Sequence, residues 1–143
     1  QAPPSVSKTA EALLVELSRD RIPVVRRAAV PGLVALGTKR AQAALLRLAS
    51  SDQKASVRVA ALSQLKSIWP VDRTLDFSVL VRKELYRALT RDISSAAAPV
   101  PVPSAVLLQR GFGDRCPEVR SECEKLVHAW LQRHGGATAL VQF

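Results

Sequence analysis

Apolar residues recur along this chain with the period of a helix, and one short pattern occurs four times. Each copy has an Asp, followed by a Val-Arg pair whose Arg lies six residues after the Asp. Relative to that Arg, positions −1, +3 and +7 are apolar, and these positions fall on one stripe of an α-helix. Four copies with the same internal spacing indicate an internal repeat. The copies begin at Asp20, Asp52, Asp76 and Asp114 and contain Arg26, Arg58, Arg82 and Arg120.

Each copy is typical of the second helix of a helix pair. Its Asp precedes the helix start, where a carboxylate matches the free N–H groups and the positive end of the helix dipole. Its Arg lies beside the buried stripe, so we expect it to reach the Asp of an adjacent copy and to form a structural Asp–Arg ladder. This arrangement resembles a HEAT repeat. The predicted fold class is all-α, a HEAT-repeat α-solenoid of stacked antiparallel helix pairs.

The repeats divide the chain unevenly. Arg26 and Arg58 are 32 residues apart, which is a full helix pair, but Arg58 and Arg82 are only 24 apart. Either the third repeat is truncated, or residues are missing near Leu75-Asp76. We predict one solenoid over residues 1–143, with repeats at 5–37, 38–70, 71–93 (truncated) and 103–134.

Turn residues predict where several helices begin and end. Pro23 suits the first turn of a helix that ends near Gly37, and Thr38 is expected to cap the next one. The second copy is expected to stay helical to Trp69-Pro70. Three prolines between 93 and 103 predict an extended connector. Further helices are expected at about 39–50, 78–91, 105–109 and 117–133.

Charge is the most informative property of the composition. The chain carries 21 Lys and Arg, 15 of them Arg, against 12 Asp and Glu, a net charge of +9. Such an excess on a solenoid suggests a polyanionic partner, most simply nucleic acid. The alternative is an ordinary solvated surface. The sequence contains no Met, so we interpret it as part of a longer chain.

Motifs for catalysis, cofactors and metals are missing. His128 and His134 lie six residues apart and off one helix face. Cys116 and Cys123 are seven apart, which does not suit a zinc site and predicts two reduced thiols. Gly111 and Gly113 are interpreted as a helix C-cap. We therefore predict a protein without enzymatic activity, cofactor or metal, and without a transmembrane span, because no apolar run of 18 residues occurs.

Two blocks of sequence follow each other in a fixed order. The first is Val57-Arg58-Val59-Ala60-Ala61-Leu62, then Thr74-Leu75, then Val81-Arg82-Lys83-Glu84-Leu85-Tyr86-Arg87-Ala88-Leu89. The second is Leu107-Leu108-Gln109-Arg110-Gly111-Phe112-Gly113-Asp114-Arg115, then Val119-Arg120 and Ala129-Trp130-Leu131. Together they span about residues 52–133 and resemble the G-type non-SMC subunit of condensin.

This resemblance implies a function. Members of that family have no catalytic activity of their own, and they hold double-stranded DNA together with the kleisin subunit. The SMC subunits, which are indirect partners, supply the ATPase, and the complex compacts mitotic chromosomes. The resemblance therefore implies a protein of the nucleus and chromosomes with a cytoplasmic pool.

A second set of cations lies on the predicted second helices but off their apolar stripe. In a HEAT solenoid the second helices line the concave face, so these side chains are predicted to contact phosphates without reading bases. The alternative for each is an ordinary exposed cation. The set consists of Arg27, Lys66, Lys83, Arg87 and Lys125.

Two other functions fit the repeat pattern. One is a HEAT scaffold or adaptor that binds only protein, with acidic or apolar partner segments on the same surface. The other is an enzyme built on HEAT-like repeats, which would need His and acidic residues clustered on one face. The chain has only two His residues, and they are isolated, so an enzyme is the least favoured of these functions.

Overall fold

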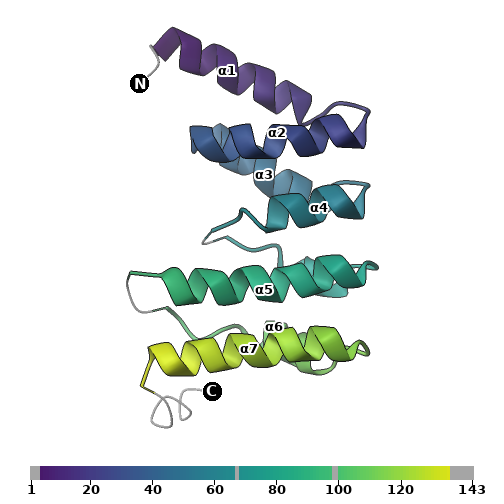
Figure 1. Cartoon of the computed structure of the whole chain (residues 1–143), viewed down its shortest axis with the longest axis vertical. Helices are drawn as coiled ribbons and strands as arrows, with labels where there is room; N and C mark the ends of the chain where they lie inside the picture. Colours follow the sequence, from purple (N-terminus) through teal and green to yellow (C-terminus); the bar gives the residue numbers. More distant parts are fainter. Residues whose placement is uncertain (1–3, 67, 98–99, 136–143) are drawn as a thin grey trace. The chain divides into compact units, whose positions relative to one another are not determined.

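The computed structural model describes residues 4–66, 68–97 and 100–135. These residues form seven α-helices and one short 3-10 helix, with no strand (Figure 1), so the all-α class is confirmed. The chain divides into two compact units, Gln1–Pro70 (unit 1) and Val71–Phe143 (unit 2). The division falls where the sequence predicts the junction between the second and third repeats.

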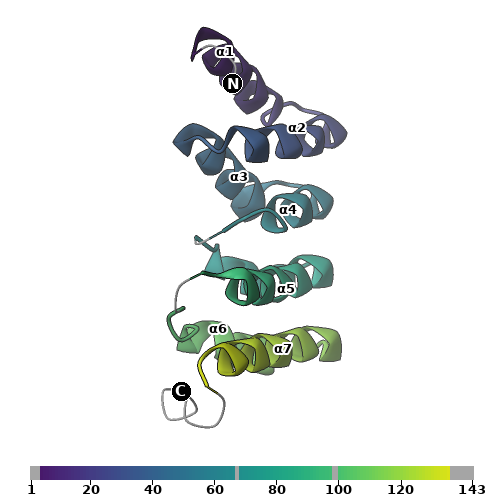
Figure 2. The ribbon, with the colours of Figure 1, turned by 60° about the vertical axis from the view of Figure 1, so that its left-hand side comes forward.

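Unit 1 contains four helices, and α3 packs against both α2 and α4 (Figures 1 and 2). Pro23 is the first residue of α2, which continues through Pro31 and ends at Leu36, followed by the C-cap Gly37, whose φ of 63° is left-handed. The Thr38 hydroxyl accepts the Ala41 N–H at 3.2 Å, as predicted for a cap. The helices are α1 (Pro4–Leu17), α2 (Pro23–Leu36), α3 (Lys39–Ser51) and α4 (Ala55–Leu62).

Helix α4 is shorter than predicted, because it ends at Leu62 rather than near Trp69. The Ser63 hydroxyl donates to the Ala60 carbonyl at 2.7 Å, which competes with continuation of the helix. The next two amides bond three residues back instead of four, and this tightens the chain into a turn. The prediction that Lys66 lies on a second helix is therefore wrong.

In unit 2, α5 and α7 lie side by side in both views, and α6 packs against α7 (Figures 1 and 2). Helix α7 has the predicted bounds, whereas α5 extends four residues beyond the predicted end and α6 continues three residues further than expected. The truncated third repeat has only a 3-10 helix before α5. The elements are η1 (Val71–Leu75), α5 (Val79–Ser95), α6 (Ala105–Phe112) and α7 (Pro117–Arg133).

The connector before α6 is attached to the end of α7. The Trp130 indole donates to the carbonyls of Val100 and Pro101, both at 3.1 Å. The His134 ring stacks on Trp130, and its Nε2 accepts the Val100 N–H at 3.1 Å. Its Nδ1 lies 2.9 Å from the Trp130 carbonyl, so both ring nitrogens have backbone partners. His134 thus has a structural role in this connector.

All four copies of the repeat share one turn geometry. In each, the Asp carboxylate accepts the N–H of the residue two positions later, at 2.8 to 2.9 Å. The Arg six positions later donates to the backbone carbonyl of the same Asp, at 2.6 to 2.9 Å. This second contact was not predicted. It closes the turn of each copy on its own helix: Asp20 with Arg26, Asp52 with Arg58, Asp76 with Arg82, and Asp114 with Arg120.

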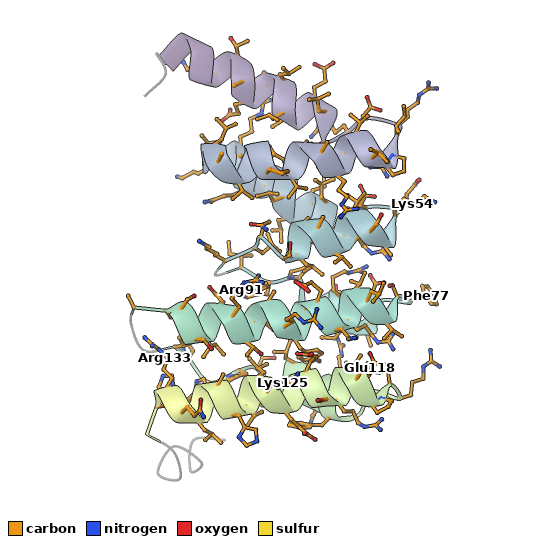
Figure 3. The ribbon with its side chains drawn as sticks, in the orientation of Figure 1. Lys54, Phe77, Arg91, Glu118, Lys125 and Arg133 are labelled. Atoms are coloured by element: carbon orange, nitrogen blue, oxygen red, sulfur yellow. The ribbon has the colours of Figure 1, made fainter. Side chains whose placement is uncertain are left out.

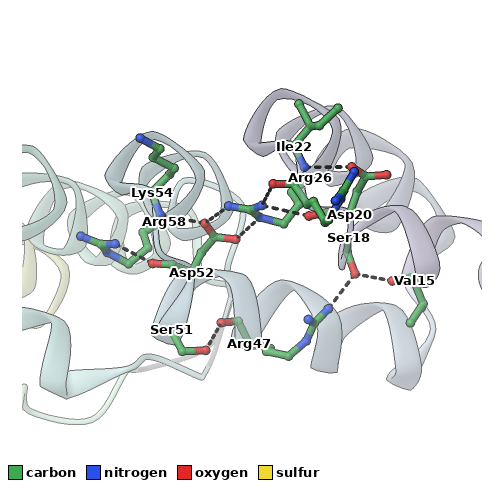
Figure 4. A network of polar contacts seen from close by, with 11 residues as sticks. Val15, Ser18, Asp20, Ile22, Arg26, Arg47, Ser51, Asp52, Lys54 and Arg58 are labelled. Atoms are coloured by element: carbon green, nitrogen blue, oxygen red, sulfur yellow. Dashed lines mark hydrogen bonds and ion pairs between the residues drawn. The ribbon is translucent and has the colours of Figure 1, made fainter.

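Contacts between copies follow the predicted register within each unit. In unit 1, Arg26 donates from Nε and Nη2 to the Asp52 carboxylate, at 2.7 and 2.9 Å (Figure 4). In unit 2, Arg82 contacts Asp114 in the same bidentate way, at 2.8 and 3.2 Å. Each Arg therefore fixes its own turn and the turn of the next copy.

Candidate nucleic-acid interface

The two units differ in charge. Unit 1 carries 11 Lys and Arg against four Asp and Glu, a net charge of +7. Unit 2 carries 10 against eight, a net charge of +2. In the described part of unit 1, eight cations but only one acid, Glu16, are exposed. Most of the positive charge of the chain is thus on the surface of unit 1.

Several cations of unit 1 gather at the turns that precede α2 and α4. There the surface has an open depression of about 450 Å³. Arg19 and Arg21 belong to the turn before α2, and Arg47 reaches the depression from α3. Lys54 projects nearby from the start of α4 (Figure 4). The depression is lined by Ser18, Arg19, Asp20, Arg21, Arg26, Arg47, Leu48, Ser51, Asp52 and Gln53.

Arg47 is a half-buried cation of the depression whose side-chain partner is a hydroxyl and not a carboxylate. Its Nη2 donates to the Ser18 hydroxyl at 2.6 Å, and Ser18 in turn donates to the Val15 carbonyl (Figure 4). Among the described residues, no carboxylate lies within ion-pair distance of it. Burial, and then repulsion by Arg19, lower the pKa of Arg47 below its usual value. A half-buried guanidinium without a carboxylate partner favours an anionic ligand.

The acids of the depression are already engaged. Burial opposes ionisation of Asp52, but the hydrogen bonds from Arg26 and from the Lys54 N–H outweigh it, so the pKa of Asp52 is lowered. The Asp20 carboxylate accepts the Ile22 N–H at 2.9 Å. Neither acid forms an ion pair with Arg19 or Arg21, which are both exposed. These two cations and Arg47 therefore remain available to a phosphate.

The five predicted phosphate contacts are distributed over both units. Arg27 is exposed on α2, and Lys66 is exposed in the irregular segment after α4. The other three, Lys83, Arg87 and Lys125, lie on α5 and α7 in unit 2. We call Arg27 and Lys66 the unit 1 group, and Lys83, Arg87 and Lys125 the unit 2 group.

The unit 2 group is paired with carboxylates. Lys83 lies 2.6 Å from Glu118, and this hydrogen bond lowers the pKa of Glu118. Arg87 and Lys125 both approach Glu122, at 3.5 and 3.4 Å. Figure 3 shows Glu118 and Lys125 on the side of α7 that faces α5. The α5–α7 face therefore has alternating charges and is less suited to a polyanion than the depression of unit 1.

Sequence reasoning missed Arg19, Arg21 and Arg47. It considered only cations of the second helices, whereas these lie in a turn and on a first helix. One signal in the sequence could have pointed to the turn of the first copy. Arg19 and Arg21 flank its Asp, whereas the turns of the other copies carry at most one cation. Nothing in the sequence indicated that Arg47 would reach Ser18.

The described residues contain no group of three or more His, Cys, Asp or Glu arranged to hold a metal ion. No helix among them has the length and apolar character needed to cross a membrane. No family model matches the chain, and no curated protein matches it in sequence.

Proposed function

We propose that this chain is a non-catalytic HEAT-repeat α-solenoid that binds double-stranded DNA, mainly through unit 1. The observation that carries the proposal is the group of cations without a carboxylate partner in the described part of unit 1, formed by the exposed Arg19 and Arg21 and the half-buried Arg47. The bidentate contacts of Arg26 and Arg82 support the stacking of repeated helix pairs on which the solenoid depends.

The sequence resemblance supports a more specific role. On that basis the chain acts in condensin as its G-type subunit, together with the kleisin subunit and, indirectly, the SMC ATPases, in mitotic chromosome condensation. Phosphate contacts from Arg and Lys would position the duplex without reading its bases. Binding is therefore expected to be indifferent to sequence and steeply dependent on salt.

The test is binding of the full chain to a short random-sequence duplex, measured by fluorescence anisotropy across a salt series. The triple variant Arg19→Gln/Arg21→Gln/Lys54→Gln removes three unit 1 cations. The matched control Lys83→Gln/Arg87→Gln/Lys125→Gln removes the same charge from unit 2. Each lost phosphate contact lowers the slope of log affinity against log salt by about 0.9.

For the unit 1 variant we expect this slope to become shallower by the equivalent of up to about three phosphate contacts. For the unit 2 variant we expect a change equivalent to less than one contact. Equal losses from both variants would show a general charge effect instead of a unit 1 interface. Absence of salt-dependent binding to the unmodified chain would refute DNA binding.

The second candidate function is a protein-binding scaffold or adaptor without DNA binding. The paired charges on α5 and α7 favour it, because Lys83 and Arg87 are already engaged with Glu118 and Glu122. Competition separates the two functions. If a kleisin segment and the duplex bind together, the condensin proposal is supported, and if only the segment binds, the chain is a scaffold.

A further inference from the structure

Phe77 is the most exposed apolar side chain in the described structure, at 100% relative exposure. It lies in the turn between η1 and α5, and Figure 3 shows it pointing away from the ribbon. The other three copies of the repeat carry Arg21, Gln53 and Arg115 at this position, directly after the Asp. The fold thus places this position in solvent in every copy, and only the third copy puts an aromatic ring there.

Phe77 borders an open depression of about 360 Å³ that lies within unit 2. Leu75, which is 65% exposed, lines the same depression and adds a second apolar side chain. The opposite side comes from the end of α6 and the turn after it, with Arg110 and Arg115. Apolar and cationic groups therefore face one small hollow.

Two of the three cations that line this hollow, Arg110 and Arg115, lack carboxylate partners in the described structure, whereas the third, Arg82, is paired with Asp114. Arg110 donates to the Thr74 hydroxyl at 3.0 Å, and among the described residues no acid lies within ion-pair distance of Arg110 or Arg115. Both acids that line the hollow are already paired: Asp76 contacts Arg73 at 2.9 Å, and Asp114 contacts Arg82 at 2.8 Å. The hollow is therefore both positively charged and apolar.

We propose that this hollow binds a segment of a partner protein that carries an acidic residue close to a large apolar residue. The carboxylate would pair with Arg110 and Arg115, and the apolar side chain would cover Phe77 and Leu75. Duplex DNA fits less well, since its backbone offers phosphates but no apolar group to cover these two side chains. The inference does not rest on DNA binding by unit 1.

The test begins with a random peptide library displayed on phage, selected on the full chain and depleted on its Phe77→Ser variant. Because Phe77 is exposed, this variant is expected to keep the melting temperature of the parent. We expect the enriched peptides to share an acidic residue near an aromatic or long aliphatic one. No enrichment over the depleted variant, or a consensus without an acid, would overturn the proposal.

The dissociation constant of an enriched peptide then tests the residues one group at a time. Leu75→Ser and the pair Arg110→Gln/Arg115→Gln are each expected to weaken binding at least tenfold, and the pair should also flatten the salt dependence. The matched controls in unit 1 are Val24→Ser, an exposed apolar residue, and Arg19→Gln/Arg21→Gln. Binding that falls equally in the controls would contradict the assigned site.

Two further outcomes identify a different occupant. If the unmodified chain self-associates in analytical ultracentrifugation and Phe77→Ser abolishes the association, then the hollow binds a second copy and the proposal is wrong. If a DNA duplex displaces the peptide from the Arg19→Gln/Arg21→Gln/Lys54→Gln variant, the hollow binds phosphates. If the chain does not bind DNA through unit 1, the peptide result is unaffected.

Discussion

Arg82 donates two hydrogen bonds to the carboxylate of Asp114, 32 residues further along the chain, and both side chains are about 7% exposed. The same guanidinium donates to the Asp76 carbonyl at 2.8 Å, so one side chain links the starts of α5 and α7. The hydrogen bonds to Asp114 raise the pKa of Arg82 despite its burial.

Removing this guanidinium should destabilise the fold strongly. Arg82→Met leaves Asp114 buried without its counter-charge, and we expect the free energy of unfolding to fall by roughly 3 kcal/mol. Chemical denaturation measures the loss. Arg82→Met/Asp114→Asn should recover part of it, because the amide oxygen can still accept the Cys116 N–H. Arg27→Met, at an exposed cation without a carboxylate partner among the described residues, is the control, and a similar loss there would contradict a special role for the pair.

Acid should weaken the fold through the two ladder carboxylates. Burial opposes their ionisation, but the contacts from Arg26 to Asp52 and from Arg82 to Asp114 prevail and lower both pKa values. A carboxyl whose folded pKa lies below its unfolded value, about 3.9, stabilises fully above that value and loses this contribution as the pH falls through the folded pKa. Melting temperatures between pH 7 and pH 2 should therefore drop mainly below about pH 4.

The variant Asp114→Asn isolates one of these carboxylates. It should be less stable than the parent at neutral pH, and its stability should fall less between about pH 4 and pH 2. Parallel curves for parent and variant would mean that Asp114 does not contribute to the acid transition.

Glu84 should show the opposite dependence. Burial raises its pKa, and the nearby charges of Arg87 and Arg91 offset this only in part. Its contribution to stability is then present below the unfolded pKa, about 4.3, and lost as the pH rises through the folded value. Glu84→Gln should therefore be neutral or stabilising at pH 7 when thermal unfolding is followed by circular dichroism. A large loss of stability would show that its contact with Arg87 matters more than its burial.

The repeat register was predictable because it depends on local spacing. The Asp and the Arg occupy fixed positions relative to the apolar stripe, so packing the stripes of two copies together brings the Arg of one copy to the Asp of the next. Contacts that depend on how neighbouring helices are offset were not predictable in this way. Arg47 with Ser18, and Lys83 with Glu118, join residues 29 and 35 apart that share no motif. For the same reason, spacing revealed the cations Lys83, Arg87 and Lys125 but not their carboxylate partners, Glu118 and Glu122.

Gly111 shows the same limit and leads to a further prediction. The sequence suggested that Gly111 and Gly113 form a helix C-cap. Gly113 is the C-cap residue of α6, but Gly111 lies inside the helix, buried against α5 and α7. A Cβ atom there would lie 2.4 Å from the Cys123 sulfur and 2.8 Å from the Tyr86 ring. Gly111→Ala should therefore lower the free energy of unfolding by about 1 to 3 kcal/mol, although Ala favours a helix.

A second substitution tests whether the clash is the cause. Adding Cys123→Ala to Gly111→Ala removes the sulfur and should recover part of the stability, as measured in a double-mutant cycle. Gly135→Ala is not a suitable control because its φ is 93°, so the exposed Ser121→Ala serves instead. Additive effects of the two substitutions would exclude contact between positions 111 and 123 as the source of the strain.

The two cysteines should differ sharply in reactivity. Cys123 is fully buried, and burial, followed by the charge of Glu124, raises its pKa to about 11. Its thiol is then protonated at neutral pH and protected from reagents, whereas Cys116 is half-buried in the turn before α7. Titration with a disulfide reagent at pH 8 should modify one thiol per native chain and both after unfolding. Cys116→Ser should abolish the native reaction, and rapid modification of Cys123 in that variant would show that the packing between α5, α6 and α7 opens readily.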